Sequence, residues 1–171
     1  MFNKGDRSEQ KELKEVSVEV SRQFKAVDFF VFSKSFLSAA EVIEREAKHL
    51  FVQRLHLSAQ SIELALKAAI LSCNVEPKET HDLVKLASKL ELLGFSMKQI
   101  EISSIVLLNH YFYQDLSTAT KFKTRYPTEK QENLGGPVPD FQTIKELFNS
   151  LVAQADLKCK TIDILPMCKF T

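Results

Sequence analysis

Three short segments of this chain carry the side chains that could do chemistry. Glu63 and Lys67 lie four residues apart in a strongly apolar stretch, Thr80-His81-Asp82-Leu83 follows a break, and Arg125-Tyr126-Pro127 ends a basic run. Carboxylate, ammonium, imidazole and guanidinium groups bind phosphate, orient a neighbour or move a proton. No glycine-rich phosphate loop or nucleophile motif competes with them. These segments are therefore the candidates for a polar cleft.

The pair Glu63 and Lys67 has two interpretations. The acid lies one helical turn before the base, which is the favourable order for a helical ion pair. If the pair faces solvent, it contributes only about 0.3 kcal/mol and has no further role. If instead it lines a cleft, Lys67 is available to a phosphate. A continuous polar stripe on the same stretch makes this face a candidate for the lining of a cleft. The stripe consists of His56, Gln60, Glu63 and Lys67.

His81 and Asp82 are expected in the first turn of a helix that Thr80 caps. The helix dipole favours a carboxylate there, and a neutral imidazole both donates and accepts hydrogen bonds. His81 therefore either makes a structural hydrogen bond to the preceding helix or loop, or orients a neighbour and takes a proton. Both roles are compatible.

The run from 121 to 127, Lys-Phe-Lys-Thr-Arg-Tyr-Pro, mixes basic and aromatic side chains. Lysines at the end of a helix match its C-terminal dipole without any ligand. Alternatively, Arg125 offers a planar fork to phosphate and Tyr126 a face on which a base stacks. Both interpretations stay open.

Helical periodicity predicts the elements that must position these groups. A first helix is expected over 27–49 and a second over 49–73. A third is expected from Thr80 to the residue before Gly94. A fourth is expected to start at a capping box formed by Ser96 and Gln99 and to reach about residue 120, and a fifth is expected to follow an N-cap at Asp140. Residues 125–140 are expected to form a loop.

On the first helix the predicted core face is Phe29, Phe32, Phe36, Leu37, Ala40 and Ile43. The second helix is apolar around most of its circumference and is expected in the middle of the bundle, with a core made of Leu55, Ala59, Ile62, Leu66, Ala69 and Ile70, broadened by Leu57, Leu64, Ala68 and Leu71. The core faces predicted for the other helices are Leu83, Leu86, Ala87, Leu90 and Leu93 on the third, Ile100, Ile105, Leu108, Phe112 and Leu116 on the fourth, and Phe141, Ile144, Leu147, Phe148, Leu151 and Ala155 on the fifth.

These elements predict an all-α fold, an antiparallel up-and-down helical bundle of about five helices. Residues 1–22 alternate in charge and are expected to form a charged N-terminal arm or frayed helix. The bundle is expected over 23–158, with a C-terminal tail at 159–171.

Composition restricts the function classes. The 23 basic and 22 acidic residues nearly balance, which argues against a protein that coats nucleic acid indiscriminately. Three cysteines do not make a disulfide framework, and no apolar stretch is long enough to cross a membrane, so a cytoplasmic protein without a membrane partner is expected. His49 and His56 lack a third ligand, and we expect no metal and no cofactor.

The motifs together resemble the HEPN family, the helical domains named for higher-eukaryote and prokaryote nucleotide binding. Three segments carry the resemblance: residues 59–68 (AQSIELALKA), Thr80-His81-Asp82-Leu83 together with Leu86, and Arg125-Tyr126-Pro127. The resemblance covers about 27–157. It implies a helical bundle, often paired as a homodimer, with a role around nucleotides or RNA, commonly in toxin–antitoxin or defence systems beside a nucleotidyltransferase-like partner.

Many members of that family are metal-independent ribonucleases in which four to six residues separate an arginine from a following histidine. This chain lacks that spacing, because His49 follows Arg45 and His56 follows Arg54 too closely. We therefore expect a nucleotide- or RNA-binding domain that is not an enzyme, with Glu63, Lys67, His81, Asp82, Arg125 and Tyr126 as the ligand-binding residues. One alternative is an endoribonuclease that pairs His81 or His110 with Arg125. Another is a non-catalytic dimeric interaction module built on the first helix.

Overall fold

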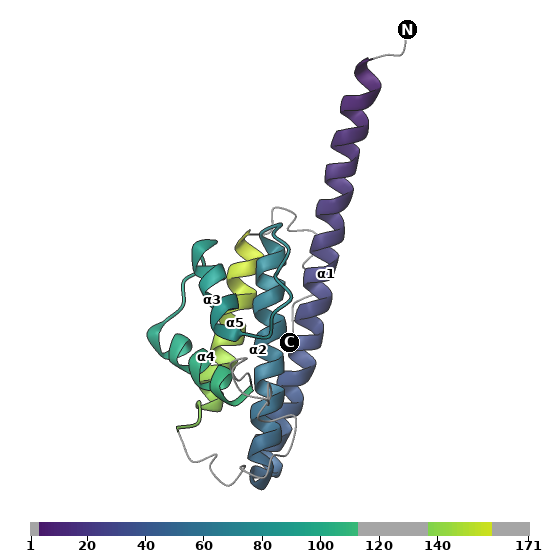
Figure 1. Ribbon diagram of the computed structural model, residues 1–171. Coiled ribbons are helices and arrows are strands. Elements are labelled where there is room, and N and C mark those ends of the chain that lie inside the picture. Colours follow the sequence, from purple (N-terminus) through teal and green to yellow (C-terminus); the bar gives the residue numbers. More distant parts are fainter. Residues whose placement is uncertain (1–3, 113–136, 159–171) are drawn as a thin grey trace.

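The protein is an all-α bundle. The structure, a computed structural model, describes residues 4–112 and 137–158. These residues form five α-helices and a short 3-10 helix: α1 (Lys4–Glu46), η1 (Lys48–Leu50), α2 (Phe51–Ser72), α3 (Leu83–Leu92), α4 (Gln99–Phe112) and α5 (Phe141–Lys158). The described part of the chain contains no strand, so the predicted fold class is confirmed (Figure 1).

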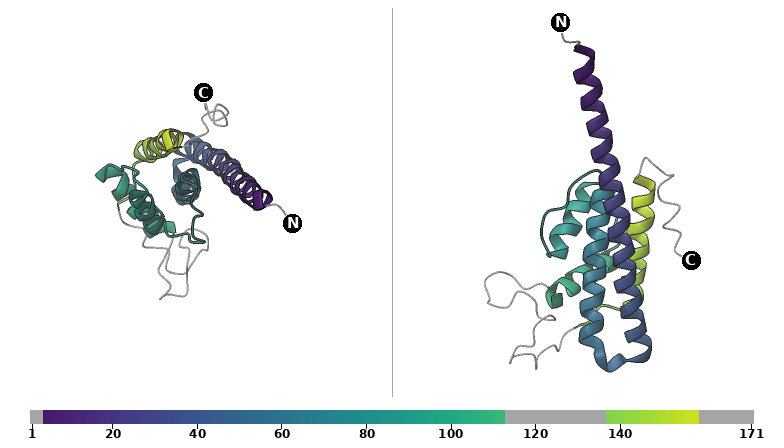
Figure 2. Two further views of the ribbon diagram at one scale, coloured as in Figure 1. Left: turned by 90° about the horizontal axis from the view of Figure 1, so that it is seen from above. Right: turned by 90° about the vertical axis from the view of Figure 1, so that its right-hand side faces the viewer.

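Helix α2 lies in the middle of the bundle. It contacts α1, α3, α4 and α5, and Figure 2 shows it surrounded by them when the bundle is seen from above. Helices α1 and α2 form an antiparallel hairpin through η1, and the first half of α1 extends beyond the bundle (Figure 1). A helix that is apolar around most of its circumference is expected to be buried on several sides. The central position predicted for this helix is therefore confirmed.

The core faces predicted for α2, α3 and α5 are largely correct. In α5 all six predicted positions are buried: Phe141, Ile144, Leu147, Phe148, Leu151 and Ala155. In α3 the buried residues are Leu83, Leu86, Ala87 and Leu90, and Leu93 packs against them. Two residues of α2, Leu57 and Leu64, are only partly buried. Regular three- and four-residue spacing of apolar side chains was sufficient to identify these faces.

The core face predicted for α1 is partly wrong. Phe32 is 60% exposed, whereas Phe30 is 2% exposed and faces the core. Residues 29–32 are all apolar, so periodicity alone does not select a face there. The observed face brings Ser33 against Ser61 of α2, where the Ser33 hydroxyl donates to the Ser61 carbonyl at 2.7 Å. Ser33 therefore lies on the same buried face of α1 as Phe30.

The start of α3 also differs from the prediction. Asp82, not Thr80, is the N-cap, because its carboxylate accepts from the backbone N–H groups of Val84 and Lys85 at 3.1 Å. The Thr80 hydroxyl instead accepts from the N–H of Asp82, which shapes the turn before the helix. At the other end, Gly94 takes a φ of +80° as predicted for a helix C-terminus.

Helices α4 and α5 begin where predicted, although the cap of α4 is different. The carboxylate of Glu101 accepts from the N–H of Lys98 at 2.6 Å, and the N–H and carbonyl of Ser96 pair with the side chain of Gln154. The predicted Ser96/Gln99 box is therefore wrong, and Ile100, expected in the core, is 60% exposed. Asp140 caps α5 as predicted by accepting from the N–H of Thr143.

No helix in the described ranges is both long and apolar enough to cross a bilayer. The described part of α4 ends at Phe112, so its predicted extension to about residue 120 lies outside the described residues, as does the loop predicted from residue 125 up to 136.

Candidate functional site

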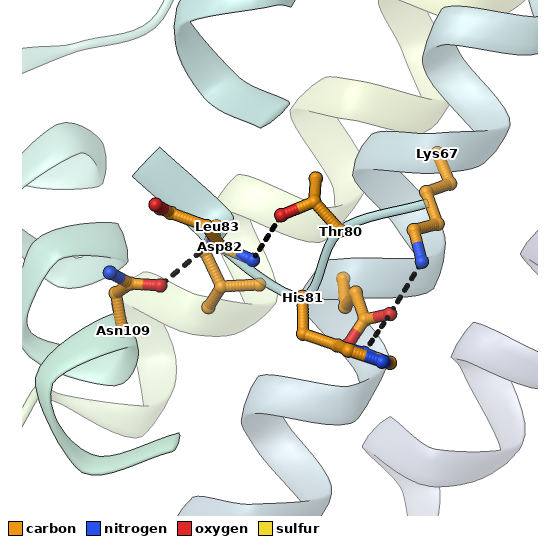
Figure 3. A network of polar contacts seen from close by, with 7 residues as sticks. Lys67, Thr80, His81, Asp82, Leu83 and Asn109 are labelled. Carbon is orange, nitrogen blue, oxygen red and sulfur yellow. Dashed lines mark hydrogen bonds and ion pairs between the residues drawn. The ribbon is translucent and has the colours of Figure 1, made fainter. Parts of the chain in front are cut away.

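The centre of the candidate site is the carboxylate of Glu63 on α2. This residue is 2% exposed, which is unusual for a charged side chain. Its Oε1 accepts a hydrogen bond from Lys67 Nζ at 2.7 Å. The imidazole Nδ1 of His81 lies 3.0 Å from Oε1 and 3.1 Å from Oε2 (Figure 3). We call these three residues the Glu63 cluster.

The local fold explains how the three side chains meet. Glu63 and Lys67 are one turn apart on the same face of α2. His81 comes from the segment that connects α2 to α3, and it reaches back over that face (Figure 3). Asp82 and Asn109 fix this segment, because Asp82 caps α3 and the side chain of Asn109 on α4 accepts from the N–H of Leu83 at 2.8 Å.

Within the Glu63 cluster the exposure of the side chains to solvent increases from Glu63 through Lys67 to His81. The carboxylate is buried, the Lys67 side chain is 15% exposed and the His81 side chain is 46% exposed. A buried carboxylate must be paired and hydrogen-bonded, and here two basic groups satisfy it. The arrangement therefore holds an ammonium and an imidazole side by side, with the imidazole toward solvent. The contacts show that Glu63, Lys67 and His81 meet, and their role in binding a ligand stays a prediction.

Of the remaining predicted site residues, the structure describes only Asp82. Its carboxylate is used in the cap of α3 and lies 3.3 Å from Lys85 Nζ. Asp82 thus holds the segment that carries His81 in place. Arg125 and Tyr126 lie outside the described residues, and their convergence with Lys67 remains a prediction.

The other histidines do not join this cluster. His56 packs its ring against Phe112 with centroids 5.5 Å apart, and His110 packs edge-on against Tyr111. Across residues 4–112 and 137–158, no three His, Cys, Asp or Glu side chains are grouped so that they could hold a metal. The structure also separates Arg54 from His56, since residues two apart do not face each other on a helix.

A second polar cluster, which sequence reasoning missed, joins the start of α2 to the end of α1 and the start of α5. Arg54 is buried, its Nε lies 3.1 Å from Glu44, and its guanidinium carbon lies 5.9 Å from the centre of the Phe141 ring. Beside it, Lys145 donates to Glu41 across α1 and α5. We call Arg54, Glu44, Glu41, Lys145 and Phe141 the Arg54 cluster.

An open cavity of about 310 Å³ lies over the Arg54 cluster. Its lining comes from α1, α5 and the cap of α5: Glu41, Glu44, Arg45, Asp140, Phe141, Gln142 and Lys145. The pKa of Glu41 is lowered, first because Lys145 donates a hydrogen bond to it. No sequence spacing could have revealed this cluster, because its members come from parts of the chain up to 104 residues apart.

Comparison with known proteins identifies the family to which the chain belongs. The family model for the HEPN domain matches residues 30–151, which include both polar clusters. No curated protein and no solved structure matches the chain. The matched region spans most of the sequence, from the packed half of α1 into α5. The resemblance seen in the sequence motifs is confirmed, and the chain belongs to the HEPN domain family.

Proposed function

We propose that this HEPN domain binds a nucleotide or a segment of RNA and recognises its phosphate at the Glu63 cluster. The observation that carries the proposal is the buried carboxylate of Glu63 with Lys67 and His81 both in hydrogen-bonding distance. Membership of a family of nucleotide- and RNA-related helical domains supports the ligand class. We further propose that the protein acts in the cytoplasm, in a toxin–antitoxin, defence or nucleotidyltransferase-linked system beside a nucleotidyltransferase-like partner.

The chemistry of Lys67 supports phosphate binding. An ammonium group has three N–H donors, and the bond to Glu63 uses one of them. The bond fixes a flexible side chain in one orientation, which lowers the entropy that a ligand must otherwise remove. Because Glu63 offsets the charge of Lys67, a single phosphate is held here by directed hydrogen bonds more than by net charge.

His81 supplies the part of the cluster that a ligand meets first. Its side chain is the most exposed of the three, and Glu63 fixes the ring by accepting from Nδ1. With Nδ1–H donating to Glu63, Nε2 accepts from a sugar hydroxyl in the neutral ring and donates to a phosphate oxygen in the imidazolium form. In the proposal, Arg125 adds a planar fork for a second phosphate oxygen and Tyr126 stacks on a base.

The test is a binding measurement with labelled single-stranded RNA and with nucleotides, by fluorescence anisotropy at several salt concentrations. Lys67→Met removes the ammonium and keeps an apolar chain of similar length. We expect weaker binding at every salt concentration, because the variant loses the N–H donors that the ammonium offers to phosphate. Circular dichroism checks that the variant is folded under the conditions of the measurement. The double variant with Arg125→Ala is expected to abolish binding.

Lys85→Met is the matched control, because Lys85 is 74% exposed and lies beside the same segment in contact with Asp82. If it weakens binding as much as Lys67→Met, general charge and not the Glu63 cluster attracts the ligand. Equal binding by wild type and the double variant would remove the proposal. RNA incubated with the protein and a chelator is expected to stay intact, and its cleavage would favour the endoribonuclease alternative.

A further inference from the structure

The cavity over the Arg54 cluster lies between the last turns of α1 and the first turns of α5, and the proposed function makes no use of it. Its volume of about 310 Å³ is that of a site for a small molecule. The charged side chains of its lining have both signs: Glu41, Glu44 and Asp140 are acids, and Arg45 and Lys145 are bases. A lining of this kind suits a ligand that also carries both signs, because an ion of one sign meets like charges on part of the wall.

The three carboxylates of the lining each use one oxygen in a contact with a neighbour. Glu41 Oε1 accepts from Lys145, and Glu44 Oε2 lies 3.1 Å from Arg54 Nε. Asp140 Oδ2 accepts from the first turn of α5 at 2.9 Å. Among the described residues, the second oxygen of each carboxylate has no hydrogen-bond partner. The cavity therefore offers three further acceptors, as many as a primary ammonium has N–H donors.

The two bases of the lining keep donors as well. Lys145 uses one of the three N–H groups of its ammonium on Glu41. Arg45 donates to Glu46 through Nε and one terminal nitrogen, and its other terminal nitrogen makes no hydrogen bond within the described part of the chain. Charged N–H donors of this kind bind a carboxylate. Acceptors for an ammonium and donors for a carboxylate thus line one small volume.

We propose that this cavity binds a free α-amino acid with a basic side chain. The acids of the lining bind its two cationic groups, and Lys145 and Arg45 bind its carboxylate. Phe141, which also lines the cavity, contacts the methylene groups of the ligand. In this arrangement every charged group of the ligand meets a group of opposite sign.

The net charge of the lining selects the basic side chain. Three acids and two bases leave an excess of one negative charge. The partners of the lining, Arg54 on Glu44 and Glu46 on Arg45, carry opposite charges and do not change this excess. A basic amino acid carries one positive charge in excess and completes the balance. An acidic amino acid would bring a further carboxylate among three others, and an amine without a carboxylate would leave both bases facing its own positive charge.

The experiment is a titration of the ¹⁵N-labelled full chain with L-arginine, followed by two-dimensional NMR without nucleotide. We expect saturable shifts of the amide signals of 41–45 and 140–145. Agmatine, which lacks the carboxylate of L-arginine, and L-glutamate are expected to bind at least about tenfold more weakly, because each loses charged hydrogen bonds. No saturable shift with L-arginine overturns the proposal. Equal affinity for agmatine or for L-glutamate also overturns it.

Two variants test the roles of the lining groups. Asp140→Asn removes a charge but keeps the cap of α5, since asparagine caps a helix as well as aspartate does, and it is expected to weaken L-arginine binding roughly threefold to tenfold. Lys145→Gln is expected to weaken L-arginine binding but not agmatine binding, which a general loss of structure would not produce. The NMR spectra also show whether each variant folds.

Glu91→Gln is the control, because Glu91 is exposed on α3 and does not line the cavity. It is expected to leave the affinity for L-arginine unchanged. A loss equal to that of Asp140→Asn, or a Lys145→Gln variant that loses L-arginine and agmatine equally, overturns the proposal. No nucleotide enters these measurements, so their outcome is independent of the proposed function.

Discussion

The Glu63 cluster and the Arg54 cluster are both ion-pair groups on α2, but they are built with opposite polarity. In the first the acid is the most buried member, with the Glu63 side chain 2% exposed against 15% for Lys67 and 46% for His81. In the second the base is buried and the acids lie toward solvent, with Arg54 at 10% against 41% for Glu44. The buried member decides which groups a ligand can reach.

This difference separates the two clusters in the kind of ligand that each is expected to bind. The Glu63 cluster presents N–H donors outward, as a phosphate site requires. The cavity over the Arg54 cluster is lined by three carboxylates, Glu41, Glu44 and Asp140, and by two bases, Arg45 and Lys145. Its bases are outnumbered by its acids, so it is less favourable to an anion than the Glu63 cluster.

The comparison predicts that Lys67→Met is the most destabilising loss of a basic side chain in either cluster. It leaves the carboxylate of Glu63, which cannot reach water, with His81 as its remaining basic partner in the cluster. Breaking a buried pair in this way costs about 3 kcal/mol in the free energy of unfolding. Urea denaturation measures the loss, and thermal melting should show a fall of roughly 6–12 °C.

Two variants sharpen this prediction. Glu63→Gln keeps the shape of the buried side chain, and Lys67 can then extend to water, so the expected loss is smaller, about 1–2 kcal/mol. Lys85→Met breaks an exposed pair and should cost less than about 0.5 kcal/mol. If Glu63→Gln were as damaging as Lys67→Met, the burial of the acid would not be what sets the cost.

The second prediction concerns Arg54→Met in the other cluster. The expected loss is about 1–2 kcal/mol, from the pair with Glu44 and the contact with the Phe141 ring. This loss of stability is smaller than for Lys67→Met, because Glu44 is half-exposed and water hydrates its carboxylate once the pair is broken. Arg45→Met is the control, since that side chain is 68% exposed and pairs only at the surface with Glu46. A loss as large as that of Lys67→Met would contradict the contrast between the clusters.

Much of the fold could be predicted because local patterns specify it. The core of α5 follows from apolar residues at helical spacing, and its start follows from Asp140, whose carboxylate reaches the N–H of Thr143. Gly94 ends α3 because a positive φ favours glycine. Prediction failed where two nearby residues fitted the same local pattern equally well. Phe30 and Phe32 were equally good candidates for the core face of α1, and Thr80 and Asp82 for the N-cap of α3.

The candidate site was only partly predictable. The spacing of Glu63 and Lys67 gives their contact directly, since it is a single helical turn. The contact of Glu63 with His81 spans 18 residues and two elements, and no periodicity encodes it. The sequence also does not reveal that Glu63 is buried. A charged residue between apolar ones gives the same sequence pattern whether its side chain lies at the surface or in the core. Both depend on how α3 packs against α2.

The smallest predicted effect is the pH dependence of the pair between Glu41 and Lys145. The hydrogen bond from Lys145 lowers the pKa of Glu41 below its ordinary value near 4.5. A lowered pKa means that the pair stabilises the folded state above that ordinary value and loses its effect as the pH falls through the lowered one. Both side chains are partly exposed, so the contribution at neutral pH is less than about 1 kcal/mol.

Lys145→Gln tests this by urea denaturation from neutral to strongly acidic pH, with Lys89→Gln at an exposed position of α3 as the control. The wild type should be the more stable protein at neutral pH, and the difference from Lys145→Gln should vanish once Glu41 is protonated. The control should show no such convergence. A difference that persisted in acid would mean that Lys145 stabilises α5 through the packing of its aliphatic chain, as Arg54 does with Phe141, and not through its charge.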